Sequence, residues 1–173
     1  MRWAKTVGVC MFLGAISVAL AGGLGIPKKE DVPKYLKQLK TAPAAADRAR
    51  AAEMLGKRGG INANDVEEAI EPLKKSLEKD TDPSVRAASA LALGSIHSEA
   101  EGIVQLLIDR LKNDNVMSVK MASVVALGQY GPNAKDALPP LRELGKKFDA
   151  KKSKEGQTIQ NTIMAISGKK KKA

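Results

Sequence analysis

The chain has 173 residues, of which 29 are Lys or Arg and 19 are Asp or Glu, so its formal net charge is +10. Hydrophobic residues make up 43% of it, which excludes intrinsic disorder over most of the length and suits one domain of ordinary size. One Cys, one His and 3% aromatic residues exclude a disulfide framework and a thiolate zinc site, and leave little for metal, haem or base-stacking chemistry.

The N-terminal segment has the pattern of a secretory signal peptide. Positive residues precede a stretch without charges at residues 7–26, and Ala19-Leu20-Ala21 provides the small residues of a cleavage site. We expect cleavage after Ala21, so that residues 1–21 form a signal peptide and residues 22–31 a linker. The mature protein is then periplasmic or extracellular, with no membrane span. The alternative is an uncleaved N-terminal membrane anchor, because this stretch is just long enough to cross a bilayer.

Hydrophobic periodicity predicts helices along the rest of the chain. Val85, Ala88, Ala92 and Ile96 recur at the spacing of one helix face, and Asp82-Pro83 supplies an N-cap followed by a proline at the first helical position. No stretch alternates between apolar and polar residues as a half-buried strand would. The predicted helices cover residues 32–41, 44–58, 65–79, 83–96, 99–112, 116–129, 134–148 and 154–167.

These helices belong to a repeat with a constant step. The same apolar pattern occurs at residues 69–73, 103–107 and 137–141, and the Ala-Leu-Gly of residues 92–94 returns at 126–128 by the same step. In the first unit, residues 35–39 fall on 69–73 at this step, whereas Met54-Leu55-Gly56 precedes its counterpart at 92–94 by a longer one. The four extra residues are therefore placed in the loop at 59–62. We predict an all-α fold, a short right-handed α-solenoid of about four antiparallel helix pairs over residues 32–167.

Glycine and proline give further detail within the repeat. Gly94, Gly128 and Gly131 lie close to predicted helix ends, where a residue in the left-handed conformation stops a helix. Pro72 and Pro140 occupy the same place in their first helices. Each proline is expected to remove an intrahelical hydrogen bond and to bend its helix, so the bend should recur along the array.

The motif of the second helices resembles a known repeat family. Residues 82–94 read Asp-Pro-Ser-Val-Arg-Ala-Ala-Ser-Ala-Leu-Ala-Leu-Gly and resemble the second helix of a HEAT repeat, of the short type also called phycobilisome-lyase-like. Residues 131–141 are similar to the turn and first helix of many such proteins. The resemblance covers residues 32–167. A tetratricopeptide array has the same period, but its aromatic and glycine signature is missing from the first helices here.

The resemblance also implies a ladder of ion pairs, in which an Asp at the end of the first helix pairs with an Arg six positions further on. Asp80 and Arg86 have this spacing, and so do Asp114 and Lys120. Lys is the poorer match, because an ammonium group cannot make the planar, two-pronged contact of a guanidinium. Ligand binding is the alternative role for Arg86, and the spacing favours the structural ladder.

Few residues could support catalysis or hold a metal. His97 lies in a turn between serines, without the elbow that a serine nucleophile needs, so we interpret it as a solvated turn histidine. Asn64 and Glu67 have the spacing of a capping box, and the acidic and amide residues of 62–67 do not match a twelve-residue calcium loop. We predict no cofactor, no metal site and no enzymatic activity.

The positive charge gathers at the C-terminal end. Residues 142–173 hold ten basic and three acidic side chains, and residues 168–173 form a basic tail. These lysines either contact an anionic surface or form a solvated polar cap on the last repeat. The candidate contacts with an anionic partner are Lys146, Lys147, Lys151, Lys152, Lys154, Lys169, Lys170, Lys171 and Lys172.

The predicted function is that of an exported, non-catalytic HEAT-repeat scaffold that binds a protein or another macromolecular partner in the cell envelope. Candidate contacts on the second helices are Ser89, Ser123 and Gln129. One alternative is an electrostatic binder of an anionic envelope surface that uses the C-terminal lysines. Another is a lyase-like chaperone for a cofactor or pigment. Export and the scarcity of aromatic residues argue against nucleic acid as the partner.

Overall fold

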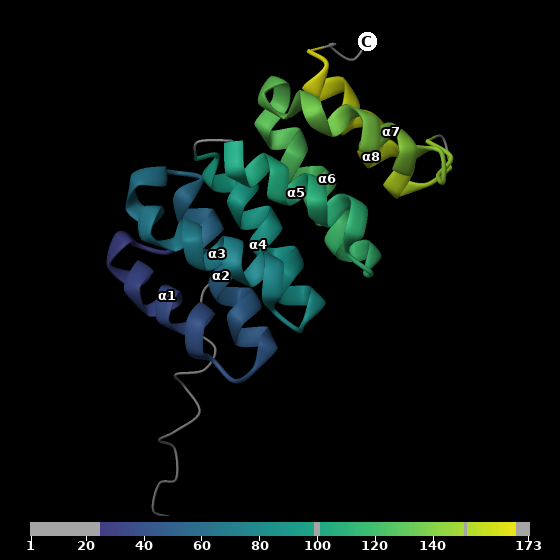
Figure 1. Ribbon diagram of the computed structural model, residues 1–173. Helices are drawn as coiled ribbons and strands as arrows, with labels where there is room; N and C mark the ends of the chain where they lie inside the picture. The colour runs from purple at the N-terminus through teal and green to yellow at the C-terminus, as the bar shows by residue number, and fades with distance from the viewer. Residues whose placement is uncertain (1–24, 99–100, 151, 169–173) are drawn as a thin grey trace, which may run out of the picture.

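The computed structural model describes residues 25–98, 101–150 and 152–168. The predicted signal peptide, the start of the linker and the lysines at 151 and 169–172 lie outside the described residues. The described chain is all-α, with short 3-10 helices between some of the α-helices (Figure 1). The α-helices are α1 (Val32–Thr41), α2 (Ala45–Gly59), α3 (Ile70–Lys79), α4 (Pro83–Ile96), α5 (Glu101–Asn113), α6 (Met117–Tyr130), α7 (Leu138–Gly145) and α8 (Lys154–Ile166). The 3-10 helices are η1 (Lys29–Asp31), η2 (Ala63–Ala69) and η3 (Gly131–Ala137).

Successive α-helices pack in pairs, α1 with α2, α3 with α4, α5 with α6 and α7 with α8. The pairs follow one another from α1 at one end of the molecule to α7 and α8 at the other (Figure 1). The second helices α2, α4, α6 and α8 also pack against one another as a continuous close row, whereas the first helices contact each other sparsely. The predicted short α-solenoid of helix pairs is confirmed. A closely spaced row lies on the inner side of a curved stack, so we refer to the second helices as the inner row.

Glycines in the inner row allow this close packing. A Cβ atom at Gly56 would lie 2.7 Å from the Cα atom of Ala92, and one at Gly94 would lie 2.8 Å from the Cα atom of Ala126. Gly94 lies inside α4 and Gly128 lies inside α6, so the expectation that these two glycines stop their helices is wrong. The described residues with positive φ are instead His97 after α4, Gly131 after α6 and Gly168 beyond α8, at φ 51°, 53° and 68°. Gly131 bears out the expected helix stop at this residue.

The repeated prolines do not bend their helices. Pro72 and Pro140 occupy the third position of α3 and α7, in the first turn, where a backbone N–H has no intrahelical partner to lose. The change of direction comes earlier, where η2 and η3 contain non-helical backbone at Val66 (φ −128°, ψ 18°) and Ala134 (φ −103°, ψ 30°). The irregularity therefore recurs at one register, as predicted, but it lies inside the 3-10 helix that precedes each α-helix.

The first repeat has a different register from the predicted one. Helix α1 begins at Val32 and α3 at Ile70, and both of these helices are ten residues long. The offset between the first two repeats is thus the same in the first helices as in the second helices. The extra residues lie between α2 and α3, as expected, but residues 35–39 correspond to 73–77, not to 69–73.

Aliphatic side chains from both helices of each repeat fill a continuous core, with isoleucines in place of leucines in α8. The largest fully buried side chains include Leu55, Leu77, Leu93, Leu127 and Tyr130. Within the described residues, no helix is long and apolar enough to cross a membrane.

Candidate functional site

Ion pairs link neighbouring repeats at the turn between the first and second helices. Arg48 in α2 donates to both carboxylate oxygens of Asp80 at the end of α3, with both N···O distances at 2.8 Å. The second terminal nitrogen of Arg48 donates to the carbonyls of Ala42 and Pro43, each at 3.0 Å. One guanidinium thus holds its own turn and the turn of the next repeat.

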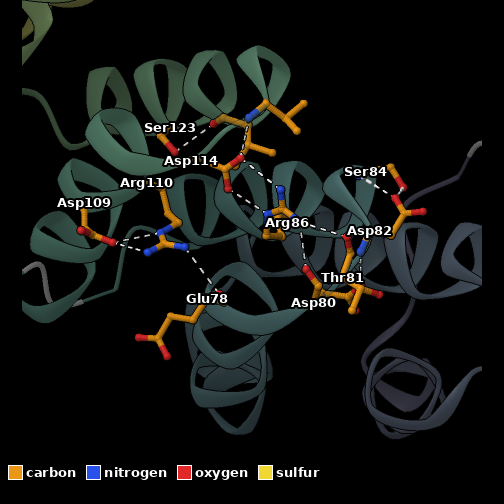
Figure 2. Close-up of polar contacts among 12 residues, drawn as sticks. Glu78, Asp80, Thr81, Asp82, Ser84, Arg86, Asp109, Arg110, Asp114 and Ser123 are labelled. Carbon is orange, nitrogen blue, oxygen red and sulfur yellow. Dashed lines mark hydrogen bonds and ion pairs between the residues drawn. The ribbon is translucent and has the colours of Figure 1, made fainter.

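The same contact recurs one repeat further on, as Figure 2 shows. Arg86 donates to both carboxylate oxygens of Asp114, at 2.8 and 3.0 Å, and to the carbonyls of Asp80 and Thr81 at 2.9 and 3.2 Å. The side chain of Asp114 is only 3% exposed. The expected pairing of Arg86 with the carboxylate six positions earlier is therefore wrong, because the carboxylate comes from the following repeat.

Each carboxylate of this ladder is also held by its own turn. Asp80 accepts a hydrogen bond from the backbone N–H of Asp82 at 3.0 Å, and Asp114 accepts one from the N–H of Val116 at 2.9 Å. The hydrogen bond from Arg48 is the main cause that lowers the pKa of Asp80. Burial acts to raise the pKa of Asp114, but the contacts with Arg86 and Val116 outweigh it and the pKa is lowered. Both groups are held ionised at neutral pH.

The ladder does not continue to the third junction. Lys120 occupies the register of Arg48 and Arg86, and its ammonium donates to the carbonyl of Lys112 at 2.8 Å. The register of Asp80 and Asp114 is occupied by Phe148, which is half-buried against the core. The expected rung between Asp114 and Lys120 is therefore absent, since Asp114 pairs with Arg86.

A groove of about 930 Å³ lies on the inner row between α2 and α4. Ala49, Ala87 and Ala88 form part of its floor, and Leu91 stands beside them with 40% of its surface exposed. Val125 occupies the register of Leu91 one repeat later and is 37% exposed. The inner row therefore presents aliphatic side chains to the surroundings at corresponding positions of adjacent repeats.

His97 supports the fold through a ring contact. Its ring is exposed and stacks on Tyr130 with the centroids 4.8 Å apart and the planes at 17°. The hydroxyl of Tyr130 donates to the carbonyl of Leu93 at 3.1 Å, and burial raises the pKa of Tyr130 to about 12. Within the described residues, no group of three or more His, Cys, Asp or Glu side chains could hold a metal ion. At residues 62–67 the N-cap is Asn62, which accepts from the N–H of Asn64.

The comparison with family models decides the relationship of this chain to known proteins. A model described as HEAT repeats matches residues 32–116 and matches again at residues 70–152. The chain belongs to the HEAT-repeat family. No curated protein matches the chain. HEAT repeats are typically protein-binding helical scaffolds and are generally not catalytic, and nothing in the match points to phycobilisome lyases specifically.

Two of the contact residues predicted on the HEAT second helices are wrong. Ser89 and Ser123 are fully buried, and the hydroxyl of Ser123 donates to the carbonyl of Val119. Gln129 is exposed on α6, so it is available for contact. Each serine lies two residues before Leu91 or Val125 in the same helix, on the buried face and not on the exposed one. Small polar residues in the sequence do not show which face of the helix is buried.

The described C-terminal lysines all lie at the surface of the last HEAT repeat. Lys146, Lys147, Lys152 and Lys154 are exposed, and Lys152 approaches Asp149 at 3.9 Å. Lys151 and Lys169–Lys172 are outside the described residues. The structure brings Lys147, but not the other three described lysines, together with Lys112 and Lys120 around one pocket.

Proposed function

We propose that this protein is an exported HEAT-repeat scaffold that binds a protein partner in the cell envelope along its inner row. The observation that carries the proposal is the exposure of Leu91 and Val125 at one register of adjacent inner helices. Aliphatic side chains that are exposed together mark an interaction site more often than aliphatic side chains scattered singly.

The surface around these two residues favours an apolar contact. The alanines that line the groove leave room for side chains of a partner, and Met54 lines the same groove. Methionine side chains are flexible and polarisable, so they adapt to different partner shapes. A partner with aliphatic or aromatic side chains fits this surface.

Charged residues limit the apolar surface on the α2 side. In α2, the position that corresponds to Leu91 of α4 is occupied by Glu53, which forms an ion pair with Lys57 at 2.6 Å. An apolar centre with a polar rim is the arrangement found in most protein interfaces. We infer that the partner lies mainly across α4 and α6, with α2 at the edge of the contact.

The sequence supports export. Residues 1–21 have the charge, apolar stretch and small-residue site of a signal peptide, and the one Cys, Cys10, lies within them. The remaining chain has no thiol, so it tolerates an oxidising compartment. N-terminal sequencing of the protein purified from its host tests this point. A chain that begins at Gly22 supports cleavage, and a chain that begins at Met1 contradicts it and favours the membrane anchor.

The binding surface is tested by affinity capture from a cell-envelope extract. The double variant Leu91→Glu/Val125→Glu places two charges on the inner row at exposed positions, so the fold should be retained. Ile61→Glu is the matched control, because Ile61 is 56% exposed in the loop that follows α2. We expect the control to retain the same protein at high salt as the unchanged chain, and the double variant to lose it. Equal retention by both variants would contradict the proposal.

A second candidate function is electrostatic attachment through the C-terminal lysines, and the exposure of Lys146, Lys147, Lys152 and Lys154 favours it. Contacts of this kind weaken steeply as salt is added, because exposed charges are screened. The same capture experiment with and without residues 169–173 separates the two functions. Retention that is lost at high salt, or on removal of the tail, indicates attachment through the lysines.

A further inference from the structure

The array contains a gap between neighbouring first helices near each of its ends. The two gaps correspond in position but are lined by different charges. The gap between α1 and α3 and the gap between α5 and α7 are lined from corresponding positions. Among the lining residues, Leu39 corresponds to Leu111, Lys40 to Lys112, Arg48 to Lys120, Pro72 to Pro140 and Lys79 to Lys147. Asp80 lines the first gap, and its counterpart Phe148 is not part of the lining of the second. The two gaps can therefore be compared position by position.

The N-terminal gap contains its own counter-charges. Arg48 is paired with Asp80, and Glu68 and Glu71 also line this gap. Glu71 accepts from Lys74 at 2.6 Å. Four cations, those of Lys40, Arg48, Lys75 and Lys79, line this gap together with three carboxylates, those of Glu68, Glu71 and Asp80. The ladder contact closes one end of it.

The C-terminal gap lacks this balance. Its pocket of about 360 Å³ is lined by three lysines, Lys112, Lys120 and Lys147, and by one carboxylate, that of Glu143. Among the described residues, no carboxylate lies within 4.0 Å of any of these three ammonium groups. Phe148 stands where the first two junctions have a ladder Asp. The ammonium of Lys120 therefore has no carboxylate partner among the described residues.

The rest of the lining selects between anionic ligands. Leu111, Leu144, Pro139 and Pro140 supply an apolar wall beside the lysines. A flat anionic membrane cannot enter a recess of this size, and the carboxylate of Glu143 opposes a group that carries two negative charges. A ligand with a single carboxylate next to apolar side chains can pair with the lysines and pack against the apolar wall.

We propose that the pocket formed by Lys112, Lys120 and Lys147 at the third junction binds an acidic peptide segment of a protein partner, whose carboxylate takes the place that Asp80 and Asp114 fill at the first two junctions. The segment carries an Asp or Glu flanked by aliphatic residues. The three lysines come from α5, from α6 and from the residues after α7, and none of them lines the inner-row groove at Leu91. The site therefore does not require that the proposed inner-row contact exists.

The test uses a fluorescein-labelled synthetic peptide with alternating Glu and Leu residues, titrated with the full chain and followed by fluorescence anisotropy. The variant Lys112→Gln/Lys120→Gln/Lys147→Gln removes the pocket charges. The matched control, Lys146→Gln/Lys152→Gln/Lys154→Gln, removes the same charge from the same end of the molecule without touching the pocket lining. We expect the Kd to rise about tenfold for the pocket variant and less than about twofold for the control, since each exposed contact contributes only modestly.

Three outcomes would overturn the proposal. In the first, the control raises the Kd as much as the pocket variant does, which means diffuse attraction. In the second, a peptide with Gln in place of Glu binds equally well, which means that the carboxylates are not recognised. In the third, phosphatidylglycerol vesicles compete fully with the peptide, which means that a lipid surface is the ligand.

The fold of the triple pocket variant needs its own check. Lys120 donates to the carbonyl of Lys112, so thermal unfolding is measured alongside the titration. Lys147→Glu, at an exposed position, gives the same test with one substitution.

Discussion

The first two junctions between repeats and the third are built from the same helices but differ at two ladder positions. At the first two junctions, an Arg of one repeat makes a two-pronged contact with an Asp of the next, through Arg48 with Asp80 and Arg86 with Asp114. At the third junction, Lys120 and Phe148 stand in their places. A contact that links two repeats is thereby replaced by a lysine that donates to a backbone carbonyl of its own repeat.

The comparison of the junctions also extends to the packing of the inner row. Gly56 and Gly94 lie against the backbone of Ala92 and Ala126, whereas a Cβ atom at Gly128 would first meet the side chain of Thr162, at 3.0 Å. A side chain can move aside more easily than a backbone atom. The first two junctions are therefore the more constrained by both the ladder and the packing, and the following predictions test this difference.

Acid should produce the largest effect, because it removes both ladder contacts together. The pKa values of Asp80 and Asp114 are lowered from the ordinary value of 3.8 in the folded chain. The unfolded chain therefore binds more protons in this range, so this stability is present above about pH 4 and is lost as the pH falls through the folded-state pKa values. Urea unfolding at a series of pH values measures the loss. In Asp80→Asn/Asp114→Asn the loss should be smaller, and an unchanged pH profile in this variant contradicts the assignment.

Asp114→Ala should destabilise the fold by about 2–3 kcal/mol, because it leaves the guanidinium of Arg86 largely buried without its carboxylate. The measurement is the free energy of unfolding in urea, followed by circular dichroism. Asp109→Ala is the matched control, since Asp109 in α5 contacts the neighbouring Arg110 (Figure 2) and is more exposed than Asp114, which directly follows this helix. The control should cost less than about 1 kcal/mol. Equal losses would show that the ladder contact has no special weight.

Gly94→Ala should destabilise by about 1–3 kcal/mol, because the added methyl group meets the Cα atom of Ala126 and forces α4 and α6 apart. Gly102→Ala, in α5, is the control, since a Cβ atom there would meet only the end of the Lys74 side chain, at 4.0 Å. The control should be neutral or stabilising, as alanine favours a helix over glycine. Urea unfolding of both variants is decisive, and a neutral Gly94→Ala contradicts the close contact.

A restored third rung should give the smallest effect. In a double-mutant cycle, Lys120→Arg and Phe148→Asp are made singly and together, because Phe148→Asp alone also loses packing against the core. We expect a favourable coupling of about 1 kcal/mol between the new side chains, as for a pair at the surface. Unfolding in urea gives the coupling free energy. A coupling of zero would show that the third junction differs in its backbone and not only at these two residues.

Two helices could be predicted to the residue from the sequence, since α1 and α4 begin and end as predicted. The predicted helices 65–79 and 134–148 are too long, because their first residues belong to the 3-10 helices η2 and η3 and α7 ends at Gly145. Periodicity and the Asp82 N-cap determine α1 and α4 locally, and the structure shows Asp82 accepting from Ser84 at 2.8 Å. The partner of Arg86 could not be found in this way. Asp80 and Asp114 lie at plausible spacings before and after it, and only the packing of repeats decides between them.

Other features needed the arrangement of helices in space. Arg48 has no Asp six positions before it, so the motif did not identify it as a ladder residue. Its spacing from Arg86 equals the spacing of Gly56 from Gly94, and this equality is a sequence signal that could have identified it. The second helices were expected to carry the contact surface, but Leu91 was not identified on it, because an exposed Leu91 and a buried Ser89 have the reverse of the usual preference. Which of these two side chains is covered is decided by the packing of neighbouring helices, which the sequence does not give.

The most direct test of the proposed inner-row contact is site-specific photo-crosslinking in living cells. A photoreactive amino acid is placed at Leu91, at Val125 or, as a control on a first helix, at the exposed Lys75. We predict that the two inner positions crosslink to one and the same protein and that position 75 does not. Crosslinking of that protein from position 75 alone, with none from positions 91 and 125, would contradict binding along the inner row.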